Sequence, residues 1–147
     1  MTLLPEPQLK IRLAQITTTQ LDPVDFQTLL ADPAGGAIAL FIGVVRNHDQ
    51  GRRVESLSYS AHPSATDRLL EILSQYAERA DVLALAVEHR IGDLEIGDLA
   101  VLAGVTSAHR ATAFEVCSEL IERVKSEVPI WKNQVFLDGT NEWIGSS

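Results

Sequence analysis

Apolar and polar residues alternate along several stretches of the chain, a pattern typical of strands with one buried face. Residues 9–17, LKIRLAQIT, and residues 54–61, VESLSYSA, both alternate in this way. Three further runs are mostly apolar and predict central strands, at 36–46, 82–92 and 98–108. The segment 130–144 contains an Asp-Gly pair and predicts a terminal hairpin that turns at Asp138 and Gly139.

Three other segments carry the apolar spacing of helices. Residues 22–33 begin with Asp22, a capping residue, and Pro23 at the first helical position. Residues 63–80 have the amphipathic pattern of a second helix. Residues 47–53, which separate two predicted strands, are polar and predict a loop. A third helix is predicted from Ala111 to Glu127, with an apolar stripe made of Phe114, Cys117, Leu120, Ile121 and Val124.

The resulting order of elements is βαββαββαββ, with hairpin-length connections between several strands. Short connections favour antiparallel pairing, because parallel neighbours need a long crossover. We therefore predict an α+β fold with two layers, in which helices pack on a largely antiparallel sheet. The 147 residues suit one domain spanning 1–147, since no linker, repeat or low-complexity tract divides the chain.

Composition narrows the possible partners and the location. The net charge of −8 argues against nucleic acid or an anionic membrane as the main partner, because both require a positive surface. The first ten residues lack the pattern of a secretion signal, and no apolar run is long enough to span a membrane. One cysteine, Cys117, excludes an internal disulfide and argues against a zinc site. We expect a cytoplasmic protein without a metal or cofactor.

Lysine is scarce, and its placement suggests chemistry. The chain has three lysines against nine arginines, and two of them, Lys125 and Lys132, flank the segment SEVPIW. Each could simply be a solvated side chain that packs its stem and bonds a carbonyl at a helix end. Alternatively, each is an amine whose charge or nucleophilicity is tuned by neighbouring cations and by partial burial.

Polar residues follow the apolar strand 98–108 where the last helix begins. Helix N-termini attract anions, and His109 and Arg110 would strengthen that attraction. In the alternative, Ser107 caps the helix and Arg110 pairs with Glu115 or another surface acid. Arg46, at the end of another apolar strand, is either a second anion ligand or an ordinary loop arginine. Cys117 lies on the apolar stripe and is interpreted as a buried hydrophobe.

Several segments match one known family in order and spacing over roughly residues 36–143. They are FIGVVRNH, HRIGDLEIGD, VTSAHRATAFE, and PIWK followed by the FLDGTNEW hairpin. In this combination the chain resembles the large, catalytic subunit of molybdopterin synthase. The resemblance implies an α+β fold with a hammerhead-like subdomain.

The resemblance also implies an activity in molybdenum cofactor biosynthesis. That family is a sulfurtransferase, which converts cyclic pyranopterin monophosphate to molybdopterin by installing a dithiolene. Sulfur arrives as a thiocarboxylate at the Gly-Gly C-terminus of a small ubiquitin-like carrier subunit. Two large subunits form a central homodimer, with one carrier at each end of the heterotetramer.

Carried over by position, the family's functional residues fall on the candidates already named. The catalytic lysines correspond to Lys125 and Lys132. The substrate-binding residues correspond to Phe41, Arg46, His109 and Arg110. Of these, His109 and Arg110 are expected to come from the neighbouring large subunit. The alternative function is a non-catalytic module that binds phosphate esters. A Schiff-base lyase using Lys132 alone is a third hypothesis.

Overall fold

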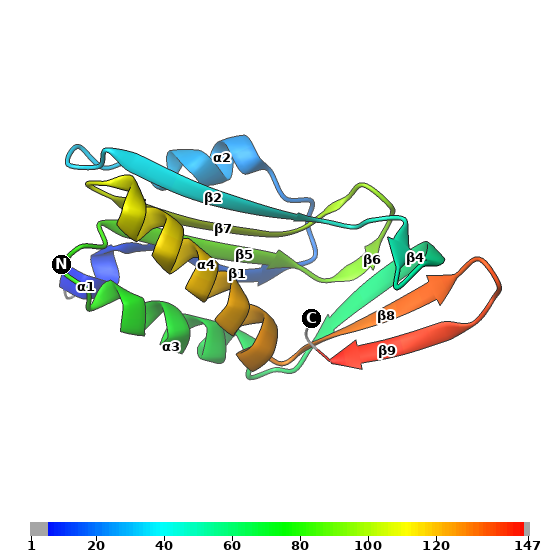
Figure 1. Ribbon diagram of the computed structural model, residues 1–147. Helices are drawn as coiled ribbons and strands as arrows, with labels where there is room; N and C mark the ends of the chain where they lie inside the picture. The colour runs from blue at the N-terminus through cyan, green and yellow to red at the C-terminus, as the bar shows by residue number, and fades with distance from the viewer. Residues whose placement is uncertain (1–5, 146–147) are drawn as a thin grey trace.

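Two β-sheets joined end to end form the framework of the computed structural model, which describes residues 6–145 (Figure 1). The first sheet has four strands in the order β1-β5-β7-β2. Their bounds are Ile11–Thr17 for β1, Ala84–Arg90 for β5, Leu99–Ser107 for β7 and Ala37–Val44 for β2. β1 pairs with β5 in parallel, whereas the pairs β5–β7 and β2–β7 are antiparallel.

Helices cover both faces of this first sheet. The helices are α1 (Glu6–Leu9), α2 (Pro23–Thr28), α3 (Ala65–Ala77) and α4 (Arg110–Glu127). α3 and α4 bury their apolar stripes against one face, and the short α2 covers part of the other (Figure 1). This two-sided burial explains why β5 and β7 read as nearly continuous apolar runs.

The second sheet extends from one end of the first (Figure 1). Its main strands run in the order β3-β4-β8-β9, and β6 also pairs with β4. Their bounds are His48–Asp49 for β3, Arg52–Ala61 for β4, Gly92–Leu94 for β6, Ile130–Phe136 for β8 and Asn141–Gly145 for β9. β8 and β9 form the predicted terminal hairpin, and Gly139 has a φ of 85° in its turn.

The α+β class and the largely antiparallel pairing are confirmed, but the strands form two sheets rather than one layer. The predicted loop 47–53 contains β3, and the predicted helix 22–33 already ends at Thr28. Asp22 caps that helix as expected, accepting hydrogen bonds from the backbone amides of Val24 and Asp25.

The prediction that Phe114 belongs to the buried stripe of the last helix is wrong. Phe114 is 66% exposed, although it was assigned to the apolar stripe of the last helix. The buried side chains of α4 are Ala113, Val116, Cys117, Leu120, Ile121 and Val124. Phe114 follows Ala113 and is therefore rotated by about 100° from the buried face. Its aromatic ring is left on the surface of the single chain.

Candidate functional site

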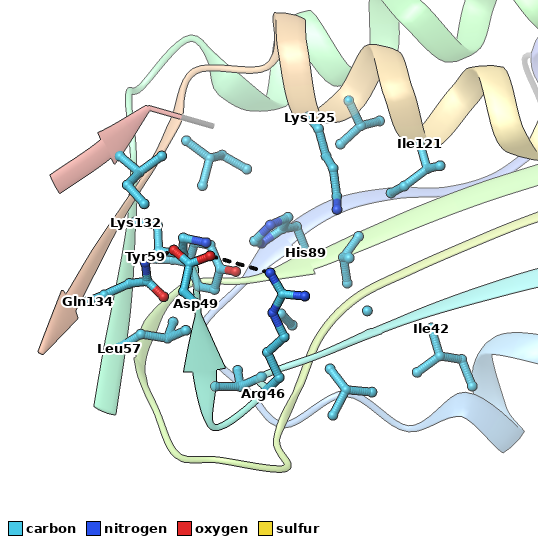
Figure 2. Close-up of a pocket in the computed structure, with 18 of the residues that line it drawn as sticks. Ile42, Arg46, Asp49, Leu57, Tyr59, His89, Ile121, Lys125, Lys132 and Gln134 are labelled. Atoms are coloured by element: carbon cyan, nitrogen blue, oxygen red, sulfur yellow. Dashed lines mark hydrogen bonds and ion pairs between the residues drawn. The ribbon is translucent and has the colours of Figure 1, made fainter. Parts of the chain in front are cut away.

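A cavity of about 500 Å³ opens where the end of α4 meets both sheets (Figure 2). Its lining combines three cationic residues with polar and aromatic ones. The charged, polar and aromatic side chains that line it include Phe41, Arg46, Asp49, Tyr59, His89, Lys125, Lys132 and Gln134. The cavity thus unites four of the six residues predicted from sequence, which are Phe41, Arg46, Lys125 and Lys132.

The two lysines reach the cavity from different elements. Lys125 lies in the last turn of α4, one turn after buried Ile121, and its Nζ is 5.8 Å from the centroid of the Phe41 ring. That distance permits a cation–π contact. Lys132 lies in β8 directly opposite Tyr59 of β4. Strand alternation turns Lys132 into the cavity and leaves the neighbouring Trp131 40% exposed on the other side.

Burial and charge together tune Lys132. Partial burial is the main cause that lowers the pKa of its amine below the usual lysine value, and the charges of Arg46 and Lys125 add to this effect. Asp49 opposes the shift. The Asp49 carboxylate accepts a hydrogen bond of 2.7 Å from Gln134 Nε2 and lies 3.4 Å from Arg46 Nη2. The hydrogen bond from Gln134 is the largest cause that lowers the pKa of Asp49.

The loss of Arg46 and the loss of Asp49 should move the pKa of Lys132 in opposite directions. Arg46→Ala removes a cation and should raise the pKa, whereas Asp49→Asn removes an anion and should lower it further. Because only the neutral amine reacts with acylating reagents, the pH profile of Lys132 labelling should shift upward in the first variant and downward in the second. Mass spectrometry measures the labelling, with Lys10 as internal reference. Shifts in the same direction would contradict the charge assignment.

The other four cavity side chains named above, Asp49, Tyr59, His89 and Gln134, were not predicted from the sequence. His89 is buried, its Nδ1 lies 2.8 Å from the carbonyl oxygen of Arg90, and the Tyr59 ring meets it edge-on at 4.9 Å. Burial is the main cause that lowers the His89 pKa to about 4, so the ring is neutral at physiological pH. His89 lies near the end of the apolar strand β5, and Arg46 lies two residues beyond the end of β2, so a position close to a strand end was the available signal.

His109 and Arg110 lie away from the cavity of the same chain. They begin α4, whereas Lys125 lies at its other end, about 22 Å along the axis at 1.5 Å per residue. Their predicted role therefore requires a second subunit. Ser107 does not cap the helix as the first alternative expected, because its hydroxyl donates to the His109 carbonyl oxygen. The Glu115 carboxylate pairs with Arg79 at 3.3 Å instead of Arg110.

Cys117 is a buried side chain of the core, as predicted. It is 6% exposed, its Sγ lies 3.8 Å from the Ala103 carbonyl oxygen, and burial raises the pKa of its thiol. Cys117→Ala should lower stability by about 1–2 kcal/mol through the small cavity that it leaves. Turnover should stay within about twofold of the unmodified protein, since a buried, protonated thiol is a poor nucleophile. Chemical denaturation and a turnover assay check both; a folded variant without activity would contradict this interpretation.

Comparison with known proteins identifies the family. The family model described as MoaE protein matches residues 16–127. The chain belongs to the MoaE family. Molybdopterin synthase catalytic subunit 1 of Mycobacterium tuberculosis is 38% identical, with 89% of each chain covered. The molybdopterin synthase catalytic subunit of Bacillus subtilis is 39% identical, covering 89% of this chain and 83% of the relative.

Solved structures agree with this MoaE membership. Molybdopterin synthase from Staphylococcus aureus superposes with a TM-score of 0.81 at 33% identity, covering 88% of this chain and 95% of that one. A chain from a complex of subunits 1 and 2 of molybdopterin-converting factor from Helicobacter pylori shares the fold, with a TM-score of 0.68 at 24% identity, and the match covers 93% of this chain and 90% of that one. The resemblance to the catalytic subunit of molybdopterin synthase, predicted from sequence motifs, is thereby confirmed. Within residues 6–145, no helix is long and apolar enough to cross a membrane.

Proposed function

We propose that this protein is the catalytic subunit of a molybdopterin synthase and acts as a sulfurtransferase. The observation that carries the proposal is the convergence of Arg46, Lys125 and Lys132 on one cavity of a chain with net charge −8. Cations are concentrated there against the overall charge, which favours an anionic substrate. The relatives compared above are named molybdopterin synthase catalytic subunits, which supports a catalytic role in molybdopterin synthesis.

The proposed reaction brings two anions into this cavity. One is cyclic pyranopterin monophosphate, whose phosphate Arg46 would hold by charge-assisted hydrogen bonds. The other is the thiocarboxylate at the Gly-Gly end of a small carrier subunit, which supplies the sulfur. Lys125 and Lys132 would serve at the reacting centre, where one orients the thiocarboxylate and the other moves protons as sulfur adds. The lowered pKa of Lys132 suits proton transfer.

The proposed assembly is a homodimer of this chain with one carrier bound to each subunit. β2 is at the edge of the first sheet, with β7 on one side. Its exposed face carries Ile38, Ile42 and Val44, which are 43%, 40% and 52% exposed. Long apolar edge strands favour pairing with another strand. Phe114 is a further exposed apolar side chain, on α4, which packs against β2.

Antiparallel pairing of β2 with its copy would complete the cavity. In each chain Ala37 of β2 lies beside Ser107, next to the start of α4, whereas the other end of β2 leads to Arg46. A two-fold axis near the middle of β2 would bring the Ala37 end of one subunit alongside the Arg46 end of the other. His109 and Arg110 of the second copy would then approach the cavity of the first. This supports the predicted contribution of both residues across the dimer.

Reconstitution from purified parts tests the proposed function. The protein, the carrier bearing a C-terminal thiocarboxylate and cyclic pyranopterin monophosphate should together yield the dithiolene product, detected after its oxidation to a fluorescent pterin. The carrier with an ordinary carboxylate is the matched control and should give no product, since it brings no sulfur. The alternative module predicts binding of the phosphate ester without product. The lyase alternative predicts that borohydride traps a carbonyl substrate on Lys132.

A further inference from the structure

His89 differs from the three cations of the cavity in the hydrogen bonds that it can make. The ammonium groups of Lys125 and Lys132 and the guanidinium group of Arg46 only donate hydrogen bonds. The Asp49 carboxylate is an acceptor, but Gln134 and Arg46 already bind its two oxygens. His89 can offer a neutral acceptor to a ligand that carries N–H donors besides its phosphate, in addition to the oxygens of Tyr59 and Gln134.

The contacts of His89 fix its tautomer. Arg90 offers a carbonyl oxygen, which only accepts, so the contact of 2.8 Å requires a proton on Nδ1. A neutral ring then carries its lone pair on Nε2, at the ring edge away from the strand. Tyr59 packs edge-on against the ring and limits its rotation. His89 lines the cavity between Tyr59 and Lys125, so Nε2 is the nitrogen available to a ligand (Figure 2).

We propose that His89 determines specificity by accepting, through Nε2, a hydrogen bond from an N–H group of the pterin ring system. The inference rests on the proposed function, because it presumes a substrate that joins a phosphate to a nitrogen heterocycle. Arg46 and the lysines recognise the charge, and His89 recognises the heterocycle. A simple phosphate ester can bind to Arg46 and the two lysines, but it has no N–H group to donate to His89.

A general-base role for His89 is less consistent with the site. With a pKa of about 4, the imidazole would hold a proton only weakly at neutral pH. Lys125 contributes to that low value through its positive charge. The same features suit a hydrogen-bond acceptor, which must stay neutral beside cations. His89 therefore contributes to recognition of the ligand rather than to proton transfer.

Two substitutions separate the functions of the two ring nitrogens. The amide of His89→Asn can replace the Nδ1 donor to Arg90 but places nothing at Nε2. His89→Gln can place an amide oxygen near Nε2 but loses the donor to Arg90. Calorimetry without the carrier would measure the binding of cyclic pyranopterin monophosphate and of phenyl phosphate, which has no N–H donor. Thermal melting would verify that each variant is folded.

His89→Asn should bind the pterin phosphate about tenfold more weakly than the unmodified protein, the expected loss of one hydrogen bond. Its affinity for phenyl phosphate should stay within about twofold, and His89→Gln should retain more pterin affinity than His89→Asn. Equal losses for both ligands, or the reverse ranking of the variants, would mean that His89 is only structural and would overturn the inference alone. If the unmodified protein bound phenyl phosphate but not the pterin phosphate, both the proposed function and this inference would fail.

Discussion

Lys125→Ala should reduce dithiolene formation by about 100-fold or more in the reconstituted reaction, the range expected for loss of a group that acts at the reacting centre. Lys125 brings a positive charge to the cavity wall opposite Lys132, and its Nζ lies over the Phe41 ring. Alanine removes both the charge and the hydrogen-bond donors. The fold should persist, because Lys125 is exposed in the last turn of α4 and alanine favours helices.

Lys10→Ala is the matched control for this experiment. Lys10 is the third lysine of the chain, and its Nζ donates to the Arg79 carbonyl oxygen at 3.0 Å, outside the residues that line the cavity. It should leave turnover unchanged. Size-exclusion chromatography and thermal melting would show whether each variant keeps its assembly and fold. Normal turnover by folded Lys125→Ala would remove the lysine from the mechanism, whatever its position in the cavity.

Local patterns predicted most of the elements, because strand alternation and helical spacing are set by neighbouring residues. The division into two sheets was not predictable in the same way. It depends on pairing between β4 and β8, where Tyr59 lies opposite Lys132 across more than 70 residues of chain. Phe114 shows the same limit, since its apolar character did not reveal which side of α4 would be covered.

The residues of the candidate site could be predicted where a charged side chain was unusual in the sequence. They could not be predicted where their properties depend on the surroundings in the folded chain. Lys125, Lys132 and Arg46 stood out because cations are few in an acidic chain. His89 and Asp49 did not, because their properties arise from burial, from the Arg90 carbonyl and from Gln134. Only the folded chain brings these partners together, so residue type alone could not indicate their states.

A mixture of two inactive variants should recover activity if the site is shared between subunits. Arg46→Ala damages the cavity of its own chain, and Arg110→Ala damages the contribution to the neighbouring cavity. In a mixed dimer, the subunit that carries Arg110→Ala keeps its own Arg46 and receives Arg110 from the other chain. One of its two sites is then intact. Random exchange should therefore restore about one quarter of the unmodified activity, since half of the dimers are mixed.

The recovery depends on the distance between the residues rather than on their charges. Arg46 lies in the cavity, and Arg110 begins the same α4 that ends near Lys125, so one chain does not supply both to one cavity. As a control, Arg46→Ala mixed with Lys125→Ala should give no recovery, because the two positions line the same cavity of one chain and a mixed dimer keeps a defect in each site. Subunit exchange would be verified by native mass spectrometry. Absence of recovery despite complete exchange would place Arg110 outside the site and contradict the shared cavity.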